Sequence, residues 1–107
     1  PADTPLVPDE ALVVADLRLD PATRTVTRAG RDITLSKTEF DLLELLMLNT
    51  GVVLTHTTIY DRIWGYDFGP SSNNLAVYIS YLRRKVDADE PVKLIHTVRG
   101  VGYTVRP

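Results

Sequence analysis

The sequence contains no cysteine, which excludes disulfide bonds, thiolate metal sites and thiol nucleophiles. Its apolar runs, such as residues 45–48, are far shorter than the about 20 residues needed to span a bilayer. No basic segment followed by an apolar stretch opens the chain, as it would in a secretory signal. We therefore expect a cytoplasmic protein that has no membrane partner.

What remains is the composition of one globular domain. The chain has 107 residues, of which 44% are hydrophobic and 24% are charged. It opens on Pro1 rather than Met, which indicates a piece of a longer protein. Prolines and acidic residues crowd the first ten positions, which predicts an interdomain linker over residues 1–11 and a folded domain over residues 12–107.

The formal net charge of -2 argues at first against a nucleic-acid partner. The charge is unevenly placed, however. Residues 1–72 carry six basic and eleven acidic side chains, whereas residues 73–107 carry six basic and three acidic ones. Because the local field decides which ligands a surface attracts, the last third of the chain could still bind an anion.

Short strands are predicted in the first third of the chain. Apolar residues alternate over residues 12–19, and β-branched residues mark residues 25–28 and 33–35. Turn residues separate these runs at 20–22 and 29–32. The pattern predicts a small antiparallel sheet.

A capping box then predicts the start of a helix, because Ser36 and Glu39 have the spacing at which each side chain bonds the other residue's backbone amide. The helix is expected to end near Asn49, and Gly51 follows where a left-handed stop is common. Its polar strip is narrow, so we expect it to lie at the centre of the core.

A shorter second helix is predicted after Thr55, which is expected to be its N-cap, and it ends at Gly65. One face of this helix is apolar, and Trp64 on it is interpreted as a core residue. A loop with a Gly-Pro pair follows over residues 66–72.

A third helix is predicted over about residues 73–86. Leu75, Ile79, Leu82 and Val86 form one apolar stripe at helical spacing. The opposite face holds amide, hydroxyl, aliphatic and basic side chains and no acidic one. Those groups match the base edges and phosphates of a DNA major groove, although a solvated helix with a basic last turn has the same pattern.

The chain ends in a predicted hairpin over about residues 94–105, whose turn spans residues 99–102. The glycines at 100 and 102 are expected to allow positive φ in this turn. Arg99 is thereby placed at the tip, where its side chain could enter a minor groove, while Thr97 could bond a phosphate. The order of elements, a sheet followed by three helices and a hairpin, predicts an α+β fold.

Four segments together resemble one known family. Residues 35–43, 62–65, 77–85 and 96–103 look like the corresponding segments of the OmpR/PhoB-type effector domain, the winged-helix DNA-binding domain of two-component response regulators. The resemblance covers about residues 12–106. It implies a winged helix-turn-helix: an N-terminal antiparallel sheet, a three-helix core and a C-terminal β-hairpin wing.

The resemblance also implies that residues 73–86 are the recognition helix in the major groove of double-stranded DNA and that residues 94–105 are the wing in the minor groove. The positions that match DNA-facing sites of the family are Asn73, Asn74, Val77, Tyr78, Ser80, Tyr81, Arg83, Arg84, Thr97 and Arg99. The loop that corresponds to the polymerase-contacting segment of activators comprises Tyr66, Asp67, Phe68, Gly69, Pro70 and Ser71.

Further partners follow from the family rather than from these residues. They are an upstream receiver domain phosphorylated by a sensor histidine kinase, a second copy on repeated half-sites, and RNA polymerase. The sequence departs from many relatives, which carry basic residues where Ser80 and Tyr81 stand and an acidic residue in place of Ala76. Which bases are read therefore does not transfer.

Other chemistry has little support. The Asp-Phe-Gly triplet at 67–69 lacks the remaining kinase motifs, and His56 and His96 lack metal-ligand spacing. Asp41 and Glu44 fit a solvated strip better than an acid–base pair. We expect no enzyme, no cofactor and no metal. The competing interpretation is a winged helix that binds only proteins.

Overall fold

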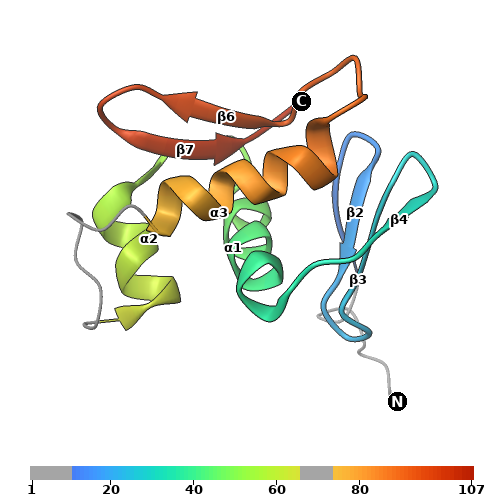
Figure 1. Ribbon diagram of the computed structural model, residues 1–107, viewed down its shortest axis with the longest axis horizontal. Coiled ribbons are helices and arrows are strands. Elements are labelled where there is room, and N and C mark those ends of the chain that lie inside the picture. Colours follow the sequence, from blue (N-terminus) through green and yellow to red (C-terminus); the bar gives the residue numbers. More distant parts are fainter. Residues whose placement is uncertain (1–10, 66–73) are drawn as a thin grey trace.

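The structure, a computed structural model, describes residues 11–65 and 74–107 (Figure 1). Residues 1–10, most of the expected linker, lie outside the described residues. The described chain begins with a four-stranded antiparallel sheet of order β1-β2-β3-β4. Its strands are β1 (Leu12–Val14), β2 (Leu17–Asp20), β3 (Thr25–Arg28) and β4 (Arg31–Ile33). The predicted N-terminal sheet is confirmed.

The position of β4 was predicted wrongly. The strand begins at Arg31, which pairs with Arg28, rather than at Ile33. Only Ala29 and Gly30 form the turn, because both have positive φ, 53° and 79°. A two-residue loop of this kind matches the twist of a hairpin, so the strands resume sooner than the four turn-forming residues suggested.

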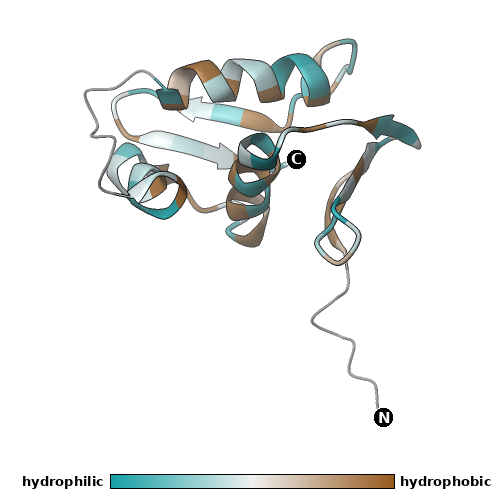
Figure 2. Ribbon diagram, turned by 60° about the horizontal axis from the view of Figure 1, so that its bottom comes forward, coloured by the Kyte–Doolittle hydropathy of each residue, from teal (hydrophilic) through white to brown (hydrophobic). Residues whose placement is uncertain are grey.

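Helix α1 (Lys37–Leu48) lies in the middle of the molecule, between the N-terminal sheet and the remaining elements (Figure 2). The capping box is present: the Ser36 hydroxyl accepts from the Glu39 amide at 3.2 Å, and Glu39 Oε1 accepts from the Ser36 amide at 2.8 Å. Most apolar side chains of α1 are buried. Gly51, with φ of 84°, follows its end as expected.

Helix α2 (His56–Ile63) begins at the predicted N-cap, where the Thr55 hydroxyl accepts from the Thr58 amide at 3.1 Å. Ile59 and Tyr60 are buried against α1 and its neighbours. Trp64 packs partly buried against the core, in agreement with its interpretation as a core residue, and Gly65 ends the turn with φ of 72°.

Helix α3 (Asn74–Leu82) continues into η3 (Arg83–Asp87), a π-helical turn. The predicted stripe is buried, but the last turn is wider than the regular helix we expected. The Ala88 amide donates to the Arg83 carbonyl at 2.9 Å, five residues back. The extra residue extends the helical segment to Asp87, which becomes buried. Asn73 lies outside the described residues.

The hairpin consists of β6 (Ile95–Val98) and β7 (Gly102–Val105). Strand β5 (Leu54–Thr55) was not predicted; it pairs with β7 and makes a second, three-stranded sheet of order β5-β7-β6. This pairing also corrects the role of Gly102, which has no positive φ. A Cβ there would lie 1.8 Å from the Leu54 carbonyl oxygen, so glycine is needed for close approach between strands.

The core lies between the N-terminal sheet, the helices and the inner face of the second sheet. Its fully buried side chains include Leu17 and Leu19 from β2, Leu42 and Leu43 from α1, and Val105 from β7. Within residues 11–65 and 74–107, no helix is both long enough and apolar enough to cross a membrane.

Candidate nucleic-acid interface

The outer face of α3 presents a mixed set of side chains to solvent. Ser80 is exposed and 39% of Tyr81 is exposed, while Asn74 and Val77 are half-buried beside them. Because the apolar stripe of the helix faces the core, these side chains lie on its other side. Hydroxyl, amide and aliphatic groups are thus offered together on one rigid helix.

Tyr78, one of the predicted DNA-facing residues, lies largely within a row of aromatic rings. Its ring centroid is 5.6 Å from that of Trp64 and 5.5 Å from that of Tyr81, to which it is nearly perpendicular. Tyr78 also packs against the core. Edge-to-face packing fixes the Tyr81 ring in direction, so Tyr78 supports the exposed Tyr81 from beneath.

The basic side chains that follow α3 have different surroundings. Arg84 is exposed, and its guanidinium carbon lies 5.4 Å from the centre of the Tyr81 ring. Lys85 Nζ instead donates to Glu39 Oε1 at 2.7 Å. Burial alone would raise the pKa of Glu39, but the hydrogen bonds from Lys85 and the Ser36 amide outweigh burial and lower this pKa. Arg84 therefore faces solvent, while Lys85 holds η3 to α1.

One hydrogen bond joins the helix to the hairpin. Arg83 Nη2 donates to Thr97 Oγ1, so two of the residues predicted to face DNA bond each other. A hydroxyl that accepts such a bond keeps its own hydrogen for donation. Thr97 is exposed on β6, so it can still donate to an incoming acceptor while it holds Arg83.

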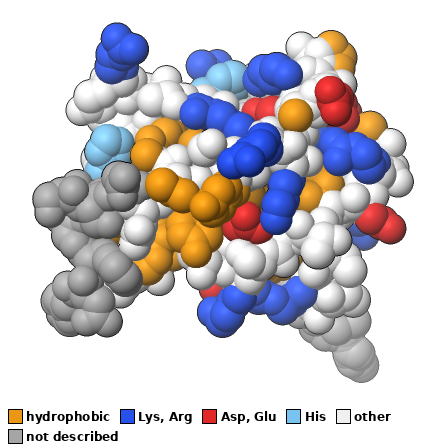
Figure 3. Space-filling model, in the orientation of Figure 1, with side chains coloured by type: hydrophobic (Ala, Val, Ile, Leu, Met, Phe, Trp, Pro, Cys, Tyr) orange, Lys and Arg blue, Asp and Glu red, His pale blue; other side chains and the backbone are white. Residues whose placement is uncertain are grey.

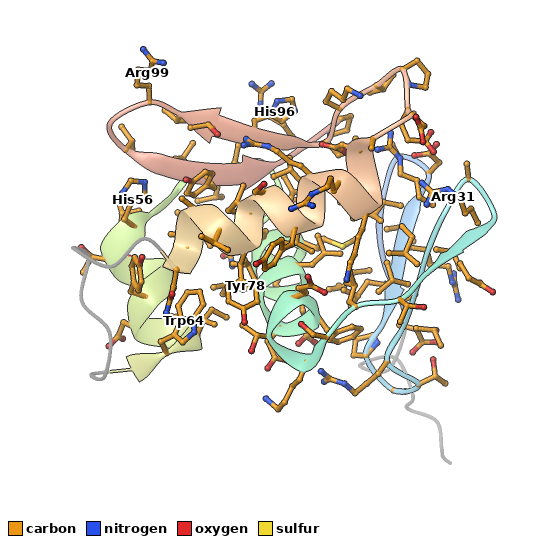
Figure 4. The ribbon with its side chains drawn as sticks, in the orientation of Figure 1. Arg31, His56, Trp64, Tyr78, His96 and Arg99 are labelled. Carbon is orange, nitrogen blue, oxygen red and sulfur yellow. The ribbon has the colours of Figure 1, made fainter. Side chains whose placement is uncertain are left out.

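Arg99 lies at the exposed tip of the β6–β7 hairpin and points away from the body of the molecule (Figure 4). The turn is closed by the Val101 amide, which donates to the Val98 carbonyl at 2.9 Å. Gly100 adopts the left-handed conformation that this tight turn requires, with φ of 79°. The hairpin therefore carries one long cation at its extremity.

Lys and Arg side chains gather on the face of the molecule that α3 crosses, beside a group of hydrophobic side chains (Figure 3). Two acidic residues that follow α3 form ion pairs with arginines of the N-terminal sheet. Asp87 is buried and lies 2.8 Å from a guanidinium nitrogen of Arg28, and Glu90 lies 3.2 Å from Arg31. Arginines of the N-terminal sheet thus reduce the negative charge near the helix and hairpin.

A hollow of about 430 Å³ lies between the end of the helix and β6. Its lining includes Ser80, Arg83, Arg84 and Lys93. Asp87, Ala88 and Ile95 complete the lining, and the Asp87 carboxylate is paired with Arg28. The three basic side chains therefore leave the hollow suited to an anionic group such as a backbone phosphate.

Sequence reasoning missed the buried pair of Arg28 and Asp87. Only 1% of Arg28 and 4% of Asp87 are exposed. A signal was present: Arg28 stands two residues after Val26 in a strand, so both side chains point to the buried face. The pair was not predicted because arginine is seldom fully buried.

The residues considered for other chemistry have structural partners. Asp41 accepts from Lys37 Nζ at 2.7 Å and from Arg24 Nη2 at 3.2 Å; burial would raise its pKa, but these bonds lower it. His56 stacks on Tyr103 with centroids 5.5 Å apart. Among the residues that the structure describes, no group of three or more His, Asp or Glu side chains could hold a metal ion. The expected polymerase-contact loop, residues 66–71, lies outside the described residues.

Comparison with known sequences places the chain among transcription regulators. A family model described as "Transcriptional regulatory protein, C terminal" matches residues 30–105. The chain is 55% identical to the response regulator MprA of Mycobacterium avium (strain 104) over 96 residues, which cover 90% of this chain and 42% of that protein. It is 54% identical to MprA of Mycobacterium bovis (strain BCG / Pasteur 1173P2), with the same coverage. The chain thus spans less than half the length of these curated relatives.

Solved structures with the same fold include the DNA-binding domain of RstA from Klebsiella pneumoniae in complex with the RstA box. The TM-score is 0.80 at 30% identity, and the match covers 91% of this chain and 97% of that one. DrrB of Thermotoga maritima, an OmpR/PhoB homologue, also matches with a TM-score of 0.80, at 28% identity over 91% of this chain and 44% of that one. These matches confirm the winged-helix fold. The chain belongs to the C-terminal domains of transcriptional regulatory proteins, as a winged-helix DNA-binding effector domain of an OmpR/PhoB-type response regulator.

Proposed function

We propose that this domain binds double-stranded DNA sequence-specifically and controls transcription, with residues 73–86 as the recognition helix in the major groove and residues 94–105 as the wing in the minor groove. The observation that carries the proposal is the pairing of two exposed features. They are the acid-free outer face of α3 with its basic continuation and a hairpin that carries Arg99 at its tip (Figure 4).

Each element has the chemistry for its groove. On α3, Asn74 and Ser80 can bond base edges or phosphates, Val77 can contact a thymine methyl group, and Arg84 can reach guanine or phosphate. Tyr81, held by the Tyr78 ring and by Arg84, adds a rigid aromatic surface. Asn73 is included in the recognition helix by its family position alone. Because the negative potential of a narrow minor groove attracts arginine, Arg99 suits the wing contact.

The phosphate contacts are assigned to Thr97, Arg83 and the basic side chains around the hollow. RstA, whose DNA-binding domain shares the fold, was crystallised in complex with the RstA box, and this supports DNA binding by a domain of this kind. The acid-rich first part of the chain predicts weak non-specific binding by one copy, so two copies on repeated half-sites supply the affinity.

We further propose the rest of the regulatory system on family grounds. A receiver domain precedes this effector domain in the full-length cytoplasmic protein, a sensor histidine kinase phosphorylates it, and phosphorylation promotes pairing on DNA. Residues 66–71 contact RNA polymerase. The domain itself has no catalytic role, no cofactor and no metal ion. The length of the curated relatives, more than twice that of this chain, supports a further domain.

Selection of bound duplexes from a random DNA pool tests the central proposal, because it tests binding and returns the site. With four to six phosphates contacted per domain, log affinity should fall against log salt with a slope of about -4 to -5. A flat salt response on every duplex, together with tight binding to a protein, would instead favour the alternative of a protein-interaction module.

The wing assignment has its own test. Arg99→Ala should weaken binding to the selected duplex about tenfold, because it removes one cation from a narrow groove. Arg99 is exposed in a turn, so the melting temperature should stay unchanged. Unchanged affinity would refute the minor-groove contact.

A further inference from the structure

The corner between the end of η3 and the start of β6 is built around a buried ion pair. Arg28 Nη1 donates to Asp87 Oδ1 at 2.8 Å and to the Val86 carbonyl at 3.0 Å. Both members of the pair are almost completely buried. An arginine of the N-terminal sheet thus holds the last residues of the recognition helix.

The same carboxylate holds the first residues of the wing. Asp87 Oδ1 accepts from the Leu94 amide at 3.1 Å, and Oδ2 accepts from the Ile95 amide at 3.0 Å. These amides lie where β6 begins, so one side chain at the end of the helix anchors the start of the hairpin.

The guanidinium of Arg28 adds two further contacts. Nη2 donates to the Val92 carbonyl, which lies in the connection between η3 and β6. Nε donates to Asp16 Oδ1 at 2.9 Å, in the turn between β1 and β2. Lys93 Nζ closes the corner from outside by donating to the carbonyls of Asp87 and Glu90 at 2.8 and 2.9 Å. The N-terminal sheet, the end of the recognition helix and the segment that leads into β6 therefore meet at Arg28.

A buried ion pair is a poor way to gain stability alone, because the two charges lose their hydration, and an apolar pair of similar size often does as well. What the pair supplies is direction. The planar guanidinium fork and the two carboxylate oxygens accept partners only along fixed lines. The pair thus constrains the direction of the groups that it joins.

We propose that Arg28 and Asp87 are positioning residues that set the angle of the wing relative to the recognition helix and so deliver Arg99 to the minor groove. The hairpin acts as a lever: from Ile95 to Arg99 it extends about 14 Å, so a tilt of roughly 10° at the root moves the tip by about 2 Å. This proposal rests on the proposed DNA-binding function. Neither residue contacts the DNA.

A double-mutant cycle between Arg28 and Arg99 tests this. Affinity for the selected duplex is measured for the wild type, Arg28→Lys, Arg99→Ala and the double variant, at a temperature where melting curves show each to be folded. Arg28→Lys keeps the charge but loses the planar fork. Arg99→Ala should cost about tenfold in the wild type and less than about threefold in Arg28→Lys, because the tip is already misplaced there.

Distant sites without shared partners normally have additive effects, so additive losses would overturn the proposal. Arg24→Lys is the matched control: it makes the same change near the other end of β3, where 48% of the side chain is exposed and pairs with Asp41. The effect of Arg99→Ala should be undiminished in that background.

If Arg28→Lys does not fold, Asp87→Asn takes its place, because the amide keeps one acceptor oxygen for the wing amides but loses the charge and the second acceptor. The cost of Arg99→Ala should again fall below about threefold. A full tenfold cost of Arg99→Ala in this variant would overturn the positioning role.

A second measurement separates this proposal from the proposed function. Residual dipolar couplings of the free protein report the direction of each amide. In Arg28→Lys the amides of β6 and β7 should change direction relative to α3, while those of α1 do not. Unchanged wing amides would overturn the positioning role. If Arg99→Ala has no effect on DNA binding and the wing amides do reorient, the wing contact fails and the positioning role stands.

Discussion

The two sheets of this domain place arginine in opposite surroundings. In the N-terminal sheet, Arg28 points inward and is 1% exposed. Its acceptors lie in the turn between β1 and β2, in η3 and in the connection between η3 and β6. In the second sheet, Arg99 stands at an exposed tip. One arginine therefore holds the fold together in the first sheet, and another is available to a ligand in the second.

The difference arises from how each sheet is attached. The N-terminal strands bury alternate side chains, as the pattern of β2 shows, and rest on α1. Strand β7 is buried along its whole length between β5 and β6, which leaves the turn beyond it free to project. A central strand that is paired on both sides and ends at an exposed turn is suited to reaching a DNA groove. The N-terminal sheet is instead suited to bracing the recognition helix.

Breaking the ion pair that links the two sheets should lower the free energy of unfolding by the largest amount. Asp87→Ala leaves the buried Arg28 without its carboxylate and two wing amides without acceptors. Loss of one partner of a buried pair costs about 3–5 kcal/mol. Denaturant unfolding monitored by circular dichroism measures this loss.

Asp41→Ala is the control, because Asp41 pairs with partly exposed Arg24 and Lys37. A pair exposed to this extent contributes less than about 1 kcal/mol. Equal losses for the two variants would contradict the contrast between an inner and an outer ion pair.

Detaching the second sheet from the body is the next largest change. Gly102→Ala places a Cβ against the Leu54 carbonyl, and relief of this overlap must separate β5 from β7. Overpacking of this kind costs about 2–3 kcal/mol in the free energy of unfolding. Hydrogen exchange should show weaker protection of the Thr55 and Gly102 region.

Gly100→Ala separates crowding from conformation in the same hairpin. Gly100 has φ of 79° and open space where a Cβ would be, so only the left-handed conformation is penalised, by about 1–2 kcal/mol. A larger loss at Gly100 than at Gly102 would refute the close-approach argument.

Local signals were sufficient to predict the sheet, the capping box of α1, the N-cap of α2 and the apolar stripe of α3. Each depends on residues that are close in sequence, such as Ser36 and Glu39. The two-strand wing with Arg99 at its tip was also predicted, because its turn is local.

Contacts between distant segments were not predictable in this way. Strand β5 consists of two residues and forms only because β7 offers it a partner, so it has no period of its own. Asp87, the last residue of the π-helical turn, is buried beside Arg28, a partner 59 positions away. At the interface, Tyr78 was assigned by family position, and its packing on Trp64 depends on two helices.

A smaller loss is expected where α1 begins, between the two sheets. Ser36→Ala removes the acceptor of the Glu39 amide and with it half of the capping box, which costs about 1 kcal/mol. Ser36→Asp supplies a new acceptor and should restore most of the stability. Urea unfolding of the three proteins measures both effects, and an equal loss in both variants would mean that the cap does not stabilise α1.

The smallest effect concerns the link from α1 to η3, where Lys85 bonds Glu39. The folded state lowers the pKa of Glu39, so its carboxylate stabilises the fold above the unfolded-state pKa, roughly 4.3, and this contribution is lost as the pH falls through the lower folded-state pKa. Glu39→Gln keeps an acceptor for the Ser36 amide but does not titrate. At pH 7 the variant should be less stable than the wild type by up to about 1 kcal/mol, and the two should converge as the pH falls through the folded-state pKa. Because Asp41 titrates in both proteins, the difference between their unfolding free energies isolates Glu39. A difference that stays constant from pH 7 to pH 3 would show that the charge of Glu39 does not hold the recognition helix to the core.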